Sequence, residues 1–205
     1  CGSRPNEAKR DMPDGDSRRR PEPKRRSERK LRPRMSLEQP SMRRAAAFLA
    51  AVRRSRRLHG RWVRPPATRQ QYQAFVRRAR MAQHACHLVF TGDDELAGVV
   101  NISEIVRGAL CSGYLGYYAF APHAGRGHLR SGLAEVIRLA FRKYKLHRLE
   151  ANIQPGNRRS IALVKGLGFA REGYSPRYLK IGGRWRDHER WALTVESWRA
   201  RAANA

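Results

Sequence analysis

The spacing of apolar residues changes its period along this chain, and that change is what most limits the fold. In the first third, apolar side chains such as Phe48, Leu49 and Val52 recur with the spacing of one buried helix face. From about residue 87 onward, short apolar runs separated by turn residues such as Gly92 are typical of strands. Helical spacing returns after Gly127. The chain is therefore expected to be an α+β protein in which helices pack against a mixed sheet.

Turn and capping residues divide these patterns into individual elements. A short strand is expected after Leu31, followed by two helices, over 42–58 and from Thr68 to about 83. Three strands should follow, over 87–90, 96–105 and 114–120. The remaining elements are a helix over about 127–144, a strand over 148–154, a helix from Asn157 to Gly166 or Gly168, and a hairpin over 178–193 that turns at Gly182–Gly183.

The chain carries a large excess of basic residues, with 44 Lys and Arg against 17 Asp and Glu and a formal net charge of +27. Such an excess attracts phosphate-rich or acidic partners and says nothing about the fold. Residues 1–28 combine this charge with four prolines and almost no large apolar side chain, so we expect a disordered tail. The tail is either an electrostatic arm for RNA or the ribosome, or a solvated extension without a function. Residues 29–198 would then form one folded domain, and residues 199–205 a C-terminal extension.

The cysteines and the apolar runs favour a cytoplasmic protein without a structural metal. Cys1, Cys86 and Cys111 are too few and too far apart for a disulfide framework or for the spacing of zinc ligands. A reducing cytoplasm fits this pattern best. The longest uninterrupted apolar run, Ala45–Val52, is far too short to span a bilayer, so no membrane contact is expected.

A glycine-rich turn, "HAGRGHLRSGL" over 123–133, stands between a predicted strand and a predicted helix. The start of a helix has unpaired N–H groups and a partial positive charge, and glycine lets the backbone approach a ligand closely. These properties suit an anion, and a pyrophosphate fits best. The turn has neither the Gly-x-Gly-x-x-Gly dinucleotide pattern nor the Gly-Lys-Ser/Thr ending of a P-loop. A tight turn without a ligand would use the same glycines, so both interpretations stay open.

A second stretch, "ANIQPGNRRSIALVKGLGFAREG" over 151–173, adds Asn157 and Ser160 at the start of the next helix. With it the chain resembles the GNAT superfamily of acetyl-CoA-dependent N-acetyltransferases, and within that superfamily the ribosomal-protein N-terminal acetyltransferases of the RimJ/RimL type. The likeness covers about residues 30–196 and includes "GVVNISEIVRG", "YLGYYAF", "LHRLEANIQPGNRRS" and "GRWRDHERWAL". It implies a mostly antiparallel sheet that is flanked by helices and splayed between its fourth and fifth strands.

The resemblance also implies where acetyl-CoA would bind. The pantetheine arm would lie in the splay beside Ala119 and Phe120, with Asn157 bonding the arm and Ser160 near the sulfur. A backbone N–H near Phe120 would polarise the thioester carbonyl as negative charge develops on its oxygen. The pyrophosphate would rest on the backbone amides of Gly125, Arg126, Gly127, His128, Leu129 and Arg130.

Three residues depart from the pattern of that family. Ala124 and Leu129 replace residues of its usual pyrophosphate motif, a change that bears on cofactor affinity but leaves the backbone amides in place. Many members have a tyrosine acid seven residues after the asparagine, whereas this chain has Val164 there. Ser160 is then the remaining candidate to hydrogen-bond the leaving sulfur. The alternative is that Ser160 only caps the first turn of its helix.

The sequence shows no sure general base. The strand over 114–120 carries no Asp, Glu or His. Glu104, on the strand before it, is either a base that faces the acceptor or a solvated edge residue. His123 and His128 flank the glycine-rich turn and are expected to bind anions or solvent. Asp187–His188–Glu189 resembles a metal or triad cluster, but strand alternation puts the histidine on the face opposite both acids, so we expect no site there.

A weakly basic acceptor amine suits a protein without a strong base. An α-amine has a pKa of about 7.7–8.0, whereas a lysine amine near 10.4 is almost wholly protonated at pH 7. We therefore expect acetyl transfer from acetyl-CoA to the α-amine of a protein N-terminus, and the resemblance implies a ribosomal or ribosome-associated protein that begins with a small residue. One alternative is an acetyltransferase for a small amine such as an antibiotic or polyamine. Another is an RNA- or ribosome-binding factor with a secondary acetyl-CoA site, which the basic tail and the arginine-rich first helix favour.

Overall fold

A seven-stranded sheet runs through the part of the chain that the structure describes. The computed structural model describes residues 34–203 together with Gly2, so the tail predicted over 1–28 lies outside the described residues except for Gly2. The strands are β1 (Met35–Glu38), β2 (Ala85–Thr91), β3 (Leu96–Val106), β4 (Ser112–Ala119), β5 (Arg148–Ile153), β6 (Ala170–Ile181) and β7 (Arg184–Thr194). They lie in the order β1-β2-β3-β4-β5-β7-β6, and every neighbouring pair is antiparallel except β4 with β5.

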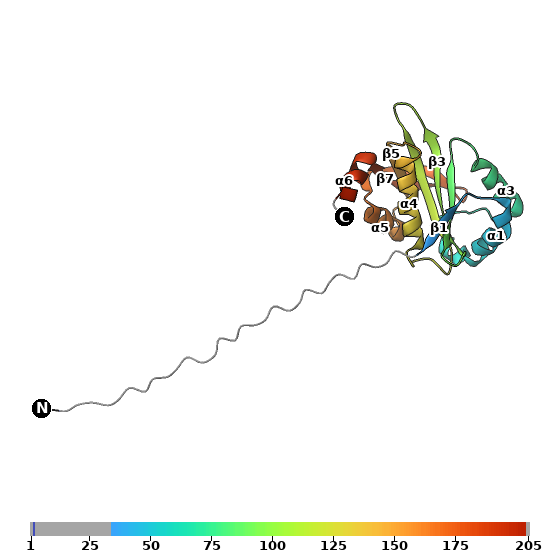
Figure 1. Ribbon diagram of the computed structural model, residues 1–205, viewed down its shortest axis with the longest axis horizontal. Helices are drawn as coiled ribbons and strands as arrows, with labels where there is room; N and C mark the ends of the chain where they lie inside the picture. The colour runs from blue at the N-terminus through green and yellow to red at the C-terminus, as the bar shows by residue number, and fades with distance from the viewer. Residues whose placement is uncertain (1, 3–33, 204–205) are drawn as a thin grey trace. The chain divides into compact units, whose positions relative to one another are not determined.

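Helices cover both faces of this sheet (Figure 1). Over one face lie the short 3-10 turn η1 (Met42–Arg44) and the helices α1 (Ala45–Arg54), α2 (Arg56–His59) and α3 (Arg69–Arg78). Over the opposite face lie α4 (His128–Arg142) and α5 (Arg158–Leu167), and α6 (Val195–Ala203) follows the last strand. No helix within residues 34–203 is long and apolar enough to cross a membrane.

Alternation along the central strands divides the core into two layers. On β3, Val100 and Ile102 join the layer beneath α4, where they pack with Leu133. Val99, the residue before Val100, points to the other face and joins the layer that contains Phe48 of α1. Burial of such side chains contributes about 1.5–3 kcal/mol each to folding. The helices and strands expected from the sequence therefore pack as one sheet with a hydrophobic core on each face.

β4 and β5 separate after their first few residues. Their parallel pairing joins Ser112–Tyr114 to Arg148–Glu150 and stops there. Beyond that point β4 continues to Ala119 and β5 to Ile153, so the two strands face each other across an open gap. This is the splay predicted between the fourth and fifth strands. Together with the mostly antiparallel sheet and its flanking helices, it confirms the predicted α+β fold.

Two of the N-terminal helices differ from their predicted extents. The helix expected over 42–58 is interrupted at Ser55, whose hydroxyl accepts the backbone N–H of Ala121 instead of facing solvent. The next helix begins at the predicted cap, Thr68, with a reciprocal capping box to Gln71, but it ends at Arg78 and continues as turns.

The C-terminal part also differs from its predicted limits. β6 begins at Ala170 rather than near Tyr178, because most of its side chains are exposed and leave no alternating apolar pattern. The two-residue turn at Gly182–Gly183 is confirmed, since Ile181 pairs with Arg184 and both glycines have positive φ. α6 runs across the boundary predicted at residue 198 and reaches Ala203.

Candidate active site

A cavity of about 1030 Å³ opens where β4 and β5 separate. Its walls come from α2 and the loop that follows it, the end of β4, the turn before α4, and the first two turns of α5. A volume of this size suits a small-molecule or cofactor ligand. The predicted cofactor residues that line it are Ala119, Gly125, Gly127, Leu129, Arg130, Asn157 and Ser160, whereas Phe120, Arg126 and His128 do not.

The turn before α4 leaves helix amides free to bind an anion. Gly125 and Gly127 have φ values of 82° and 90°, in the left-handed region that glycine adopts without strain. A Cβ built at Gly125 would meet no atom within 4 Å, so this part of the turn borders open space. The N-cap of α4 is Gly127, which has no side chain to cap the helix, whereas Thr68 caps α3 and Asn157 caps α5. The first N–H groups of α4 therefore lie beside the cavity in the state that an anion site requires.

Two arginines of the predicted pyrophosphate loop make hydrogen bonds within the protein. The Arg130 guanidinium donates to the carbonyl oxygen of Gly166 at 3.0 Å and so ties the start of α4 to the end of α5. The backbone N–H of Arg126 donates to the carbonyl of His123 at 3.2 Å, within the turn itself. Of the six amides predicted to hold the pyrophosphate, that of Arg126 is therefore already bonded.

The end of β4 presents the backbone N–H of Ala119, not that of Phe120, to the gap. The N–H of Phe120 donates to the carbonyl of Ala97 at 2.8 Å. Ala119 is the partner of Gly98 on β3, and residues along an antiparallel strand alternate between hydrogen-bonded and non-bonded pairs. The N–H of Ala119 consequently points away from β3 and toward the splay. The backbone donor predicted near Phe120 is thus better supplied by its neighbour.

Ser160 contacts a tyrosine that sequence analysis did not single out. The hydroxyls of Ser160 and Tyr117 lie 2.7 Å apart, and either can donate to the other. Asn157 Oδ1 accepts the N–H of Ser160 at 3.3 Å, so Asn157 caps α5 and the Ser160 hydroxyl is not needed for capping. Burial raises the pKa of Tyr117 to about 12, although its hydrogen bond with Ser160 opposes the shift, so the phenol keeps its proton at neutral pH. The two hydroxyls form a hydrogen-bonded pair at the edge of the cavity.

Val164, the third departure from the family pattern, does not line the cavity. Its side chain is 0% exposed and belongs to the core beneath α5. A tyrosine hydroxyl reaches the same helix from β4 instead. The signal was present in the sequence, because strand alternation puts Tyr117 on the same face as the buried Leu115. What the sequence did not show was that this face meets Ser160, a contact between residues 43 positions apart.

α2 and the loop after it add five further residues to the cavity, and two of them, His59 and Trp62, have aromatic rings. His59 Nε2 lies 2.9 Å from the carbonyl oxygen of Ala119, and burial lowers the pKa of the ring. The Arg61 guanidinium stacks over the Trp62 ring at 4.5 Å, and a Cβ at Gly156 would meet that ring at 3.3 Å. Neither residue belongs to a sequence motif. Both reach the cavity because α2 packs on the sheet.

Glu104 is not brought to the cavity. Its side chain is exposed, and it lies at a β-bulge where the pairing of β3 with β4 shifts, with a φ of 50°. Tyr117 pairs with Val100, so Glu104 lies four residues along β3 from that pair, or about 13 Å. Its role as a base stays a prediction.

The two histidines beside the glycine-rich turn pack against each other edge to face, with ring centroids 5.8 Å apart. His123 Nε2 lies 3.3 Å from a carboxylate oxygen of Glu95, and burial lowers the pKa of His123. His128 Nδ1 is buried without a hydrogen-bond partner among the described residues. A carboxylate therefore occupies the polar side of His123, where an anion had been expected.

The cluster near the C-terminus is dispersed as strand alternation implied. Asp187 accepts hydrogen bonds from Tyr174 and from the N–H of Arg177, and Glu189 accepts one from the Trp191 indole. His188 is 2% exposed, and its Nδ1 bonds to the carbonyl of Arg186. Within residues 34–203, no three side chains of the types that bind metals lie together.

The proteins to which this chain is similar agree with this site geometry. Residues 34–170 match the family described as "Acetyltransferase (GNAT) domain". The chain is 42% identical over 106 residues to the ribosomal protein uS5-alanine N-acetyltransferase of Escherichia coli (strain K12), which covers 52% of this chain and 55% of that protein. It is 38% identical over 106 residues to the "Probable N-acetyltransferase YjcK" of Bacillus subtilis (strain 168), which covers 51% of this chain and 59% of that protein. The match thus spans little more than half the length of these curated relatives.

Solved structures extend the likeness over more of the chain. RimJ of Mycobacterium smegmatis, solved in complex with CoA-disulfide, has a TM-score of 0.73 at 28% identity and covers 83% of this chain and 89% of that one. Spermidine N-acetyltransferase of Vibrio cholerae, solved with CoA and spermine, has a TM-score of 0.70 at 16% identity and covers 81% and 98%, which shows a shared fold alone. Because the family match covers well over half of the sequence and the splayed sheet agrees with it, this chain belongs to the GNAT acetyltransferases.

Proposed function

We propose that this protein transfers the acetyl group of acetyl-CoA to the α-amine of a protein N-terminus. The acceptor in this proposal is a ribosomal or ribosome-associated protein that begins with a small residue. The observation that carries it is the cavity in the β4–β5 splay, which combines uncapped helix amides at one end with the Tyr117–Ser160 hydroxyl pair further in. The related Escherichia coli protein is named for transfer to an alanine of a ribosomal protein, which supports this choice of acceptor.

The cavity residues fit acetyl-CoA in three places. The amides of Gly127, His128 and Leu129 would hold the pyrophosphate, since no side chain caps them. The N–H of Ala119 would donate to the thioester oxygen, where negative charge develops during acyl transfer. The Ser160 hydroxyl would donate to the sulfur as it leaves, with Tyr117 as its hydrogen-bond partner. A bond of this kind strengthens as the sulfur gains charge and so acts on the transition state.

The acceptor is argued from charge and basicity. An α-amine is partly neutral at pH 7, so it can attack the carbonyl carbon without a strong base. The protein then contributes mainly by positioning the two reactants. A polyamine is the second candidate acceptor, because spermidine acetyltransferases share the fold. A formal net charge of +27 disfavours it, since the protein repels a polycation on approach.

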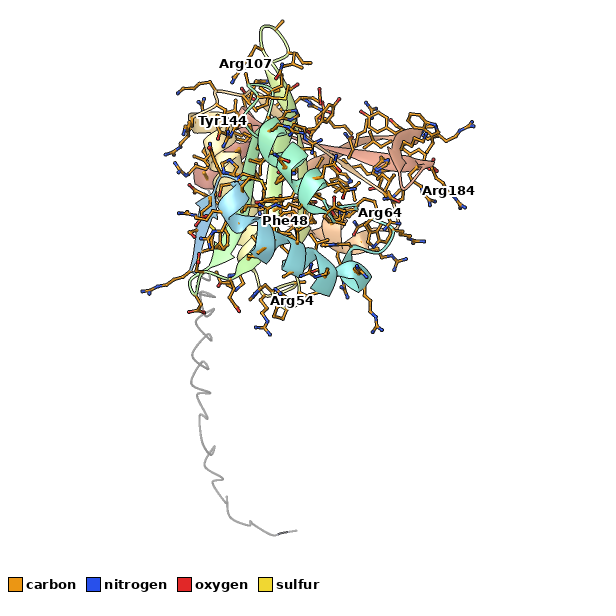
Figure 2. All side chains as sticks on the ribbon, turned by 90° about the vertical axis from the view of Figure 1, so that its right-hand side faces the viewer. Phe48, Arg54, Arg64, Arg107, Tyr144 and Arg184 are labelled. Atoms are coloured by element: carbon orange, nitrogen blue, oxygen red, sulfur yellow. The ribbon has the colours of Figure 1, made fainter. Side chains whose placement is uncertain are left out.

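RNA is the second partner that we propose, through a surface we call the arginine face. Between Glu38 and Asp93 the sequence has twelve arginines and no acidic residue. This segment includes η1, α1, α2 and α3, the helices that face the viewer in Figure 2, and strand β2. Its exposed arginines include Arg53, Arg54, Arg56 and Arg57, on or beside α1 and α2. Arginines so placed displace counterions from phosphates, and this would hold the enzyme near a ribosomal acceptor.

A peptide assay tests the acceptor. The protein is incubated with acetyl-CoA and a peptide that begins with Ala or Ser and contains an internal lysine, and mass spectrometry locates the acetyl group. We expect it on the α-amine, and we expect no turnover when that amine is blocked in advance. Spermidine and an aminoglycoside serve as competing acceptors. Modification of the lysine, or a preference for either small amine, would refute the N-terminal assignment.

A salt titration tests the arginine face. Binding of a structured ribosomal RNA fragment is measured for the wild type, for the chain without residues 1–28, and for Arg53→Glu/Arg54→Glu. The matched control is Arg138→Glu/Arg142→Glu, which changes the charge by the same amount on α4, over the opposite face. Removal of residues 1–28 and the Arg53→Glu/Arg54→Glu substitution should each flatten the slope of log affinity against log salt, by about 0.7–0.9 for each lost phosphate contact. Equal slopes for the Arg53/Arg54 and Arg138/Arg142 variants would show attraction by net charge alone.

A further inference from the structure

One helical turn holds the end of β4 from the side of α2. Ser55 and His59 are four residues apart, and the N–H of His59 donates to the carbonyl of Ser55 at 2.9 Å, so both side chains leave the same face of that turn. Ser55 is 0% exposed and His59 is 5% exposed. Two polar side chains buried this deeply need hydrogen-bond partners. Both find them on one short stretch of backbone.

That stretch lies on either side of Phe120. His59 Nε2 donates to the carbonyl of Ala119 at 2.9 Å, and Ser55 Oγ accepts the N–H of Ala121 at 2.9 Å. Phe120 itself is bonded to Ala97 through its N–H. Three successive residues are therefore each fixed by a separate hydrogen bond. Two of these bonds come from α2 and its preceding residue, and they are not part of the sheet.

The splay explains why these bonds are needed. The pairing of β4 with β5 ends at Tyr114, so the carbonyl and N–H of Ala119 on that edge have no neighbouring strand to bond. His59 supplies the partner for the carbonyl. Its ring packs edge to face against Tyr118 and Phe120, with centroids 5.4 and 5.6 Å away, which fixes the ring plane. Because a carbonyl can only accept, Nε2 must carry the proton.

We propose that His59 and Ser55 are positioning residues for acetyl transfer, which hold the end of β4 so that the N–H of Ala119 stays aimed into the cavity. This inference rests on the proposed function, in which that N–H donates to the thioester oxygen. In the reaction, the amine nitrogen forms a bond to the carbonyl carbon, the carbon–sulfur bond breaks, the amine loses one proton to solvent, and the sulfur leaves with the bonding electrons. His59 neither gives nor takes a proton, since its Nε2–H stays on the Ala119 carbonyl.

The size of the effect follows from the geometry. A donor misplaced by about 1 Å costs roughly 100-fold in rate, because the donor must already lie where the charge develops. Binding of the CoA portion depends on the start of α4, not on His59. Loss of the His59 bond should therefore lower kcat about 10- to 100-fold and change the Kd for CoA about threefold or less.

Two variants of His59 and one control test this. His59→Leu removes the donor, whereas His59→Gln keeps an N–H that can reach a carbonyl. His188→Leu is the matched control, since His188 is also buried and bonded to a backbone carbonyl at 2.9 Å but does not line the cavity. Single-turnover rates with a peptide beginning with Ala, CoA affinity by calorimetry, and thermal unfolding are measured for each. We expect His59→Leu to lower the single-turnover rate and His59→Gln to restore that rate to within about fivefold of the wild-type value. His188→Leu should lower the stability and leave the rate unchanged.

Hydrogen exchange of residues 117–121 gives a readout that needs no turnover. It should be faster in His59→Leu, and in Ser55→Ala as the second variant if the leucine variant does not fold, but not in His188→Leu. Unchanged exchange, or a wild-type rate in His59→Leu, overturns the proposal. So does a His59→Gln variant as slow as His59→Leu that has lost the acidic limb of its pH–rate profile, because His59 would then be a base. If the wild type acetylates no amine while exchange responds as expected, the proposed function fails and the positioning of β4 stands.

Discussion

Removal of the Ser160 hydroxyl should slow acetyl transfer with little effect on acetyl-CoA binding. The hydroxyl lies 2.7 Å from Tyr117, and burial keeps that phenol protonated. A hydrogen bond to a charged group contributes about 1.5–3 kcal/mol, and the leaving sulfur is charged only as the carbon–sulfur bond breaks. Ser160→Ala is therefore expected to lower the single-turnover rate about 10- to 150-fold, at 1.36 kcal/mol for each factor of ten. The Kd for acetyl-CoA should change about threefold or less.

A double-mutant cycle shows whether the two hydroxyls act together. If Tyr117 acts only through Ser160, Tyr117→Phe lowers the rate in the wild-type background but has little further effect in Ser160→Ala. Quenched-flow measurement with a peptide beginning with Ala, under conditions where every enzyme molecule holds acetyl-CoA, isolates the chemical step. Additive effects of the two substitutions would refute the coupled pair. A folded Ser160→Ala variant with the wild-type rate would remove Ser160 from the mechanism altogether.

Three further predictions concern the anion site, the base and the response to acid. Gly127→Pro should weaken acetyl-CoA binding in calorimetry far more than His128→Ala does, because proline removes an N–H and cannot adopt the positive φ of 90° found there; equal affinities for wild type and Gly127→Pro would refute the site. Glu104→Gln should remove one limb of the pH–rate profile if Glu104 is the base, and an unchanged profile excludes that role. Burial lowers the pKa of His59, His87 and His188 in the folded protein, so below the ordinary histidine pKa of about 6.5 the unfolded chain binds more protons than the folded one. The free energy of unfolding should therefore fall as the pH drops from about 6.5 toward the lowered pKa values. A melting temperature that rises from pH 7 to pH 5 would contradict this.

Much of the fold was predictable because the signals are local. The order of helices and strands, the Thr68 cap and the Gly182–Gly183 turn all depend on residues within a few positions of each other. β6 was shortened in the prediction because most of its side chains are exposed and leave no alternating apolar pattern. Its position depends on pairing with β7, a partner that follows it in the sequence. Periodicity identifies a strand only where one face of it is buried.

The candidate site was predictable in part, for the same reason. The glycine-rich turn and Asn157 belong to contiguous motifs, and the cavity includes them. Tyr117 and His59 belong to none, since they contact Ser160 and Ala119, which lie 43 and 60 positions further along the chain. The alternation of β4 could have singled out Tyr117. Nothing in the helical pattern of residues 42–58 indicated that His59 would bond to a strand.

If acetyl-CoA binds in the gap between β4 and β5 as proposed, it would also join the two parts of the sheet. Within residues 34–203, backbone pairing joins β4 to β5 along Ser112–Tyr114 and Arg148–Glu150 and stops there, so the N–H of Ala119, further along β4, faces the gap. An extended ligand in the gap would complete the sheet as an additional strand does. An unpaired strand edge also attracts the edges of other chains, and here α2 and α5 flank it while a formal net charge of +27 keeps copies apart. We therefore expect acetyl-CoA to raise the melting temperature and slow aggregation on heating, most clearly at high salt, where repulsion between copies is screened.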